Sequence, residues 1–200
     1  MPTPHETVDW QARYDEGRAH WQRPGTNPVF DAWMEAGVLA PGCAVLVPGC
    51  GRSHELLELA RRGFSVTGID LVPAAVEVMR ARLTEEGLSA EVVQADLFAW
   101  EPGRTFDAIY EQTCLCALHP DDWQAYVARL HTWLRPGGLL CALFMQTGRP
   151  GGPPFHCDLE RMRTLFDDGR WEWPAAEPLP SPHPASPEIH ELGFVLVRRG

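Results

Sequence analysis

The chain has 200 residues, 44% of them hydrophobic, which suits one globular domain with a sizeable core. Its formal net charge of -10 argues against a nucleic acid as a partner, because phosphate binding requires a basic surface. Its apolar runs are shorter than the roughly 20 residues of a membrane span, and its N-terminus lacks the regions of a signal peptide. Its six cysteines follow no disulfide or zinc spacing. We therefore expect a cytoplasmic protein with reduced thiols.

The N-terminal segment, residues 1–41, precedes the first predicted strand. Helical patterns cover 8–17 and 28–36, and the turn-rich stretch 22–27 separates them. We therefore expect short helices ahead of the sheet.

Strand and helix patterns alternate after this segment. Predicted strands lie near 44–48, 65–69, 90–94, 105–110, 138–145 and 191–198, with a short one around 171–173. Predicted helices lie near 53–62, 73–86, 121–134 and 158–167. The alternation indicates a Rossmann-like, doubly wound, mostly parallel sheet between two layers of helices. Residues 174–187 include six prolines and are predicted as an irregular loop.

A glycine turn follows the first predicted strand. Gly49 and Gly51 allow a sharp bend, a helix follows, and the next strand ends at Asp70. In a parallel sheet this unit brings the turn and Asp70 together at the carboxyl edge, where such sheets bind nucleotide-like ligands. An alternative is that Asp70 caps the next helix.

The details of this turn favour S-adenosylmethionine over a dinucleotide. His54 stands where the dinucleotide fingerprint has its third glycine, which serves close packing near a pyrophosphate. A second acid, Asp96, follows the third strand, where its carboxylate can accept from an adenine amino group and the Leu97 N–H can donate to the ring. An NAD-dependent oxidoreductase is therefore disfavoured.

Several motifs together resemble one family. They are Trp10-x3-Tyr14 and Trp21, followed by VLVPGCG, GIDL, ADLF, FDAIYEQTCLCAL, LRPGG and GGPPF, and they span residues 10–155. The chain resembles the thiopurine S-methyltransferase family, which includes bacterial members and a plant branch of thiol and halide/thiocyanate methyltransferases. The resemblance implies a seven-stranded sheet with an antiparallel last strand. It also implies one S-adenosylmethionine-dependent methyltransferase domain over residues 1–200, with 1–41 as a helical cover over the cofactor.

The resemblance also implies cofactor contacts for particular residues. The cofactor would be covered by Trp10, Tyr14 and Trp21, and its methionine part would have room at Gly49 and Gly51. Asp70 would accept hydrogen bonds from the ribose hydroxyls, and the adenine would be held by Asp96, Leu97 and Phe98. Glu111 would lie near the sulfonium. Trp10 and Trp21 have ordinary packing as their alternative role. His119 and His156 could each be a catalytic base or an ordinary surface residue. We assign no catalytic or metal-binding residue.

The acceptor is expected to be a small, soft nucleophile. A thiol has a pKa of about 8.5 and needs no strong base to ionise, and a halide or thiocyanate needs none. Many family members have an Arg directly after the acid that ends the fourth strand, and here Gln112 stands there. We therefore expect a thiol, sulfide, thiocyanate, halide, or selenium or tellurium compound, with S-adenosylhomocysteine as the other product.

Three residues are candidates for the acceptor pocket: Gln112, Thr113 and Phe155, the last within a lid at 151–155. Two alternatives stay open: a thiopurine-type aromatic thiol as the acceptor, or a protein that binds the cofactor without turnover. A macromolecular acceptor is disfavoured by the acidic charge. We expect a monomer.

Overall fold

The computed structural model describes residues 8–19, 21–183 and 186–200. Its helices are α1 (Trp10–Asp15), α2 (Pro28–Glu35), α3 (His54–Arg61), α4 (Pro73–Glu85), α5 (Trp123–Trp133) and α6 (Leu159–Leu165), with a 3-10 turn η1 (Leu115–Ala117). Its strands are β1 (Ala44–Pro48), β2 (Ser65–Asp70), β3 (Glu91–Gln94), β4 (Phe106–Gln112), β5 (Leu134–Gln146), β6 (Trp171–Glu172), β7 (Leu179–His183) and β8 (Ser186–Arg198).

Within the described residues, these strands form an eight-stranded sheet. The order is β3-β2-β1-β4-β5-β8-β6, and β7 pairs with β8 beside this path. Strands β1 to β5 run parallel, and β8 is antiparallel to β5, which confirms the predicted mostly parallel sheet with an antiparallel last strand. The sheet has eight strands where seven were predicted, because β7 pairs with β8. The neighbours of β1 are β2 and β4, so the chain reverses direction across the sheet at this point, where ligands bind in such folds.

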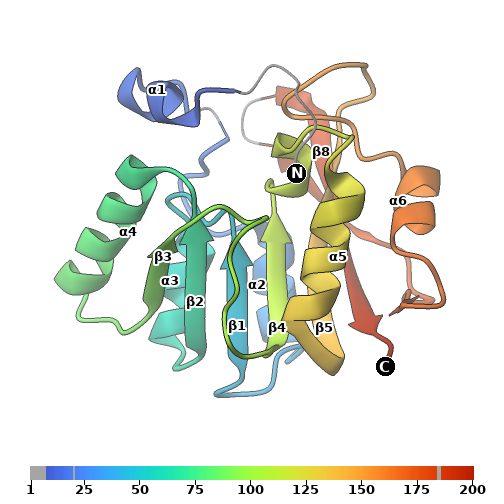
Figure 1. The fold of residues 1–200 in the computed structure, drawn as a ribbon, viewed down its shortest axis with the longest axis horizontal. Coiled ribbons are helices and arrows are strands. Elements are labelled where there is room, and N and C mark those ends of the chain that lie inside the picture. Colours follow the sequence, from blue (N-terminus) through green and yellow to red (C-terminus); the bar gives the residue numbers. More distant parts are fainter. Residues whose placement is uncertain (1–7, 20, 184–185) are drawn as a thin grey trace.

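The two faces of the sheet are covered by different helices (Figure 1). Leu46 and Ile109 face the layer of α5 and α6, where Trp123 and Met162 are buried. The alternate positions of the same strands face α2, α3 and α4. Because successive side chains of a strand point to opposite faces, β1 and β4 supply both cores, which confirms the predicted three-layer αβα fold.

The C-terminal part of the chain differs from its prediction. Strand β7 lies inside the predicted loop 174–187, and β8 begins at Ser186 instead of near 191. Pro180 and Pro182 stand two positions apart in β7, so their missing N–H groups share one side, which a strand at the edge of a sheet tolerates. The proline content therefore led to the prediction of a loop where the structure has an edge strand.

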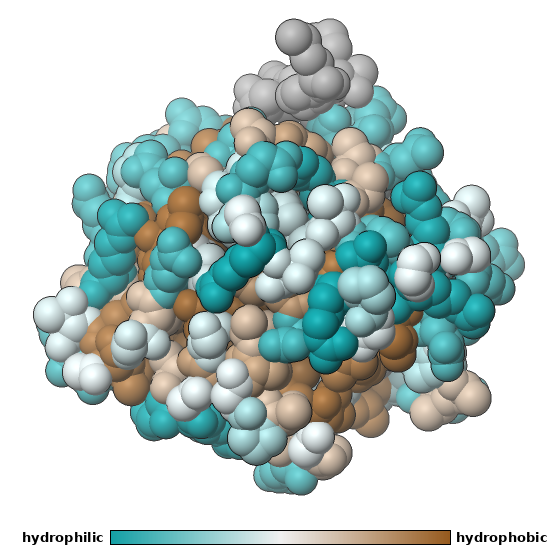
Figure 2. Space-filling view, turned by 60° about the horizontal axis from the view of Figure 1, so that its bottom comes forward, coloured by the Kyte–Doolittle hydropathy of each residue, from teal (hydrophilic) through white to brown (hydrophobic). Residues whose placement is uncertain are grey.

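The outer surface is mixed in character. On the face shown in Figure 2, hydrophilic residues separate the hydrophobic areas. None of the helices in the described ranges is long and apolar enough to cross a membrane. Residues 1–7, on which the expected absence of a signal peptide depends, lie outside those ranges.

Gly193 of β8 provides a test of the packing between the sheet and α2. A Cβ there would meet Val29 Cγ1 at 2.5 Å and Trp33 Cζ2 at 3.1 Å. We expect Gly193→Ala to lower the free energy of unfolding by about 1–3 kcal/mol, as overpacking does, in urea denaturation. Gly25→Ala is the control, since a Cβ there meets nothing within 4 Å. Equal stability of both variants would contradict this packing.

Candidate functional site

The turn after β1 is closely packed by its neighbours. Gly49 and Gly51 have φ values of 55° and 51°, in the left-handed region that glycine adopts without strain. A Cβ on Gly49 would meet Cys114 Sγ at 2.8 Å, and one on Gly51 would meet the Tyr14 hydroxyl at 2.8 Å. Both glycines are therefore needed for their conformation and for the close approach of other segments.

Asp70 joins this turn to the end of β2. Its Oδ2 accepts a hydrogen bond from Gly51 N at 2.7 Å, and its Oδ1 accepts one from Val72 N at 2.9 Å. The residue is only 8% exposed, and burial raises the pKa of the carboxyl while the backbone hydrogen bonds oppose that rise. The N-cap residue of α4 is Val72, so capping by Asp70 does not account for this carboxylate.

A cavity of about 590 Å³ opens beside Asp70 at the carboxyl edge of the sheet. Its volume lies in the range of about 300–1,000 Å³ that is typical of small-molecule sites. Most of the predicted cofactor residues line it: Trp10, Tyr14, Trp21, Gly49, Asp70, Asp96, Leu97 and Phe98. Thr113 lines it as well. The structure thus brings together residues that lie far apart in the sequence.

The N-terminal aromatic residues form one cluster over the turn. Trp21 makes edge contacts with both Trp10 and Tyr14, with ring centroids 5.4 and 5.6 Å apart. The Arg52 guanidinium lies 4.9 Å from the centre of the Tyr14 ring. Burial, with a smaller contribution from Asp70, raises the pKa of Tyr14 to about 12, so its hydroxyl is protonated at neutral pH.

Helix α1, which holds Trp10 and Tyr14, lies beyond the arrowheads of β2 and β4 (Figure 1). Gln11 Oε1 accepts a hydrogen bond from Ala74 N at 3.3 Å and ties this helix to the start of α4. The N-terminal segment therefore forms one wall of the cavity.

Asp96 lies on the wall beside β3. It is exposed, and its Oδ1 accepts a hydrogen bond from Phe98 N at 2.8 Å. This bond closes a tight turn that holds Leu97 and Phe98 at the cavity.

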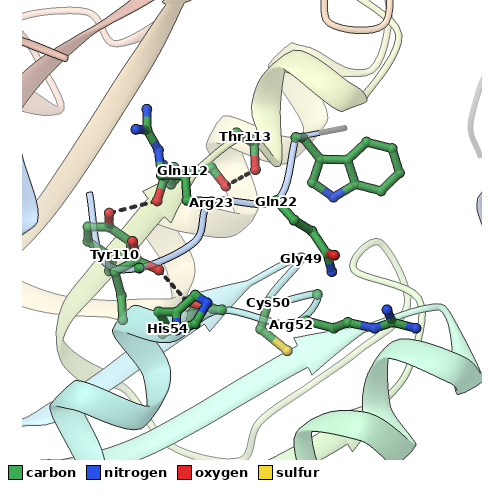
Figure 3. A pocket seen from close by; sticks show the side chains of 15 residues that line it. Gln22, Arg23, Gly49, Cys50, Arg52, His54, Tyr110, Gln112 and Thr113 are labelled. Atoms are coloured by element: carbon green, nitrogen blue, oxygen red, sulfur yellow. Dashed lines mark hydrogen bonds between the residues drawn. The ribbon is translucent and has the colours of Figure 1, made fainter. Parts of the chain in front are cut away.

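A smaller cavity of about 70 Å³ also lies at the glycine turn and shares Trp21, Gly49 and Thr113 with the larger one (Figure 3). Gln22, Arg23, Gly51, Arg52 and Gln112 are among its lining residues. Gln22 Nε2 and Arg52 Nε are buried and make no hydrogen bond within the described part of the chain. In Figure 3 the Gln22 side chain points toward the turn, where Arg52 begins.

Gln112 lines this smaller cavity and not the larger one. Its Oε1 accepts from the Tyr110 hydroxyl at 2.8 Å, and its Nε2 donates to Glu191 at 3.4 Å. Arg23 and Asn27 also donate to Glu191, at 2.7 and 2.8 Å. Gln112 thus belongs to a buried polar network, and its expected place in the lining of the acceptor pocket stays a prediction.

Glu111 also differs from its expected place. It is 1% exposed, lines neither cavity, and accepts a hydrogen bond from Leu115 N at 2.7 Å. Its other oxygen, Oε2, has no partner among the described residues. Burial, followed by the nearby Glu191, raises the pKa of Glu111 to about 7. The side chain therefore lies under η1 instead of on the wall where the sulfonium was expected.

Phe155 is not among the residues that line the larger cavity. Its backbone N–H donates to Cys116 O at 2.8 Å, and its ring contacts His119 with centroids 5.5 Å apart. Pro153 and Pro154 of the same segment line the cavity in its place. His156 Nδ1 accepts from Thr147 N at 3.1 Å, which is a structural role.

The wall formed by β5 and β8 was not predicted from the sequence. Met145, Thr147 and Arg149 line the cavity at and after the end of β5. Their position at and after the end of a predicted parallel strand could have indicated them, because such strand ends meet at the carboxyl edge where ligands bind. Ile189 lines it from β8, between the predicted loop 174–187 and the predicted strand 191–198.

Comparison with known proteins agrees with this geometry. The family model described as Thiopurine S-methyltransferase matches residues 5–178. The chain belongs to the thiopurine S-methyltransferase family. It is 34% identical over 170 residues to a thiopurine S-methyltransferase of Pseudomonas putida, covering 75% of this chain and 77% of that protein. It is 32% identical over 160 residues to a probable thiol methyltransferase 2 of Arabidopsis thaliana, covering 78% of this chain and 70% of that protein.

Solved structures of other proteins share the fold of this family member. The magnesium protoporphyrin IX methyltransferase of Synechocystis PCC 6803 with bound S-adenosylhomocysteine gives a TM-score of 0.74 at 17% identity, over 94% of both chains. A structure from work on the conversion of a disulfide bond into a thioacetal group during echinomycin biosynthesis gives 0.76 at 24% identity, over 94% of this chain and 91% of the other. The chain is an S-adenosylmethionine-dependent methyltransferase by family.

The buried Glu111 gives a prediction about pH and stability. Since folding raises its pKa from 4.5 to about 7, the protonated form stabilises the fold fully below pH 4.5, and this stability is lost as the pH rises through 7. We expect Glu111→Gln to reduce the fall in stability between pH 5 and pH 8, by about 1–3 kcal/mol, in urea denaturation. Exposed Glu85→Gln is the control. The same fall in Glu111→Gln as in the parent chain would contradict the assignment.

Proposed function

We propose that this chain transfers the methyl group of S-adenosylmethionine to a small, soft nucleophile such as a thiol, hydrosulfide, thiocyanate or halide, or a selenium or tellurium compound. Its family and its relatives support the reaction type. The single observation that carries the proposal is the larger cavity, because it adjoins a buried carboxylate, Asp70, and an aromatic cover.

The residues present fit the cofactor. A carboxylate has about four acceptor positions, and backbone N–H groups use one on each oxygen of Asp70, so further positions suit the ribose hydroxyls. Asp96, Leu97 and Phe98 would hold the adenine. The two unpartnered donors of the smaller cavity, on Gln22 and Arg52, suit the carboxylate of the amino-acid end.

When bound, S-adenosylmethionine supplies a methyl group already activated by its sulfonium. The chain then needs to orient the nucleophile and exclude water, which can account for most of the rate. Trp10, Tyr14 and Trp21 present aromatic rings that favour a nearby cation by about 1 kcal/mol. We assign no general base, since a thiol near its pKa ionises without one.

The thiols of the cavity wall stay unreactive in this scheme. Cys114 and Cys116 line the cavity, and burial raises the pKa of both well above its usual value. The Cys116 thiol also donates to Thr113 O at 3.4 Å. Neutral thiols are poor nucleophiles, so an external acceptor does not compete with methylation of the enzyme itself.

The remaining expectations are part of the same proposal. Residues 1–41 would cover the cofactor, and residues 1–200 would act as one methyltransferase domain. The enzyme would be a cytoplasmic monomer with a small-molecule acceptor and no nucleic acid partner, in keeping with its acidic charge. The proline-containing segment 151–155 would close over the acceptor.

The acceptor class is tested by incubating the protein with S-adenosylmethionine and each soft nucleophile in turn, with thiopurines included. We expect methylated, partly volatile products from small thiols, hydrosulfide or thiocyanate, detected by headspace gas chromatography. Exclusive methylation of thiopurines would select the aromatic alternative. Binding of the cofactor with no product from any acceptor would select a protein without turnover.

Asp70→Asn tests the cofactor site without turnover. The amide retains the size of the carboxylate and loses its charge, and a hydrogen bond to a charged group contributes about 1.5–3 kcal/mol. We expect the dissociation constant of S-adenosylhomocysteine to rise roughly tenfold to hundredfold in isothermal titration calorimetry. Glu85→Gln serves as the matched control. Unchanged affinity in Asp70→Asn would place the nucleoside elsewhere.

Arg52→Ala tests the smaller cavity separately. We compare S-adenosylhomocysteine with 5'-methylthioadenosine, which lacks the amino-acid end. Arg52→Ala is expected to weaken the first ligand about tenfold more than the second, because one charge-assisted bond is lost. Equal losses for both ligands would show that Arg52 acts only through its contact with Tyr14.

A further inference from the structure

The larger cavity has two halves that the strand order separates. Asp70 ends β2 and Asp96 follows β3, both on one side of β1, whereas Thr147 follows β5, beyond β4 on the other side. If the nucleoside lies along β2 and β3, as the proposed function requires, the acceptor enters from the β5 and β8 side.

The acceptor half has a mostly apolar and soft wall. Its lining residues include Cys116, Leu118, Met145, Pro153, Pro154 and Ile189. Such a wall strips water from a nucleophile and strengthens any charge interaction inside it. A positively charged group on this wall therefore influences which acceptor binds.

Arg149 provides that charge. It is exposed, and among the residues that the structure describes it has no ion pair with a carboxylate. The other arginines of the cavity are engaged, since Arg13 lies over the Trp10 ring and Arg18 pairs with Glu16. His183 does not supply a competing charge, because burial and Arg23 lower its pKa. Glu188 lies on the same wall and is not within ion-pair distance of Arg149.

The backbone around Arg149 is held in place. Thr147 Oγ1 donates to Arg149 O at 3.1 Å and accepts from Arg149 N at 3.4 Å. His156 Nδ1, from the segment that follows the prolines, accepts from Thr147 N. These bonds attach the loop after β5 to the segment that closes the acceptor half, so Arg149 stays at the mouth of this half.

We propose that Arg149 is the residue that selects anionic acceptors, by binding the thiolate, hydrosulfide or thiocyanate charge in the β5 and β8 half of the cavity. Gln112 does not line the larger cavity and carries no charge. The inference rests on the proposed function for its reaction, and it goes beyond it by naming the charge partner of the acceptor.

The charge balance of the reaction fixes which kinetic constant changes. The acceptor sulfur forms a bond to the methyl carbon, and the electron pair of the broken carbon–sulfur bond remains on S-adenosylhomocysteine. The anionic charge of the acceptor is spent as this bond forms, so Arg149 stabilises the bound anion more than the transition state. Removing it is expected to raise KM for an anion and to raise kcat slightly instead of lowering it, because the bound anion loses more stabilisation than the transition state does.

The test compares Arg149→Gln and Arg149→Lys with the parent chain. For thiocyanate we expect KM to rise about tenfold in Arg149→Gln, which is the loss of one charge-assisted bond, and less in Arg149→Lys. For the neutral acceptor dimethyl selenide we expect no change. Arg199→Gln, which follows β8 at the opposite edge of the sheet, controls for net charge.

A binding measurement keeps the inference independent of turnover. The complex with S-adenosylhomocysteine is titrated with carbon-13-labelled thiocyanate and followed by NMR. We expect the dissociation constant to rise about tenfold in Arg149→Gln and to stay unchanged in Arg199→Gln. Thiocyanate binding that is unaffected by Arg149→Gln, or equal losses for the anionic and neutral acceptors, overturns the inference. If thiocyanate binding depends on Arg149 but the parent chain transfers no methyl group, the proposed function is contradicted and the anion site at Arg149 is still supported.

Discussion

The hydrogen bond from Gly51 N to the Asp70 carboxylate is the constraint on which the site depends. A buried carboxylate is costly unless its oxygens are hydrogen-bonded, and here the glycine turn and the start of α4 supply the two donors. The bond locks the turn after β1 to the end of β2. It thereby fixes the surface on which Tyr14 packs, so the shape of the larger cavity follows from it.

A second buried network attaches the N-terminal segment to the far side of the sheet. Glu191 of β8 is fully buried and accepts from Arg23, Asn27 and Gln112. A buried ion pair is tolerated when its remaining positions are hydrogen-bonded, as they are here. Together with the bond between Gln11 and Ala74, this network holds the segment at both ends across the cavity.

Local patterns in the sequence predicted most of the fold and the cofactor half of the site. The glycine turn, Asp70 and Asp96 stand at strand ends, where topology alone brings them together. The places of Glu111, Gln112 and Phe155 depend on the direction of individual side chains. Successive residues of a strand point to opposite faces, so the end of β4 directs Glu111 under η1 and Gln112 toward Glu191. Arg149 lies in a loop without periodicity, and only the strand order shows that it reaches the acceptor half.

The central claim is that the larger cavity holds the methyl donor with Asp70 at its ribose. A crystal structure of the complex with S-adenosylhomocysteine tests it most directly. We expect both ribose hydroxyls on the Asp70 carboxylate, the adenine beside Asp96 and Phe98, and the sulfur facing the β5 and β8 half. A nucleoside bound away from Asp70, or an adenine in the half that Arg149 lines, would contradict it.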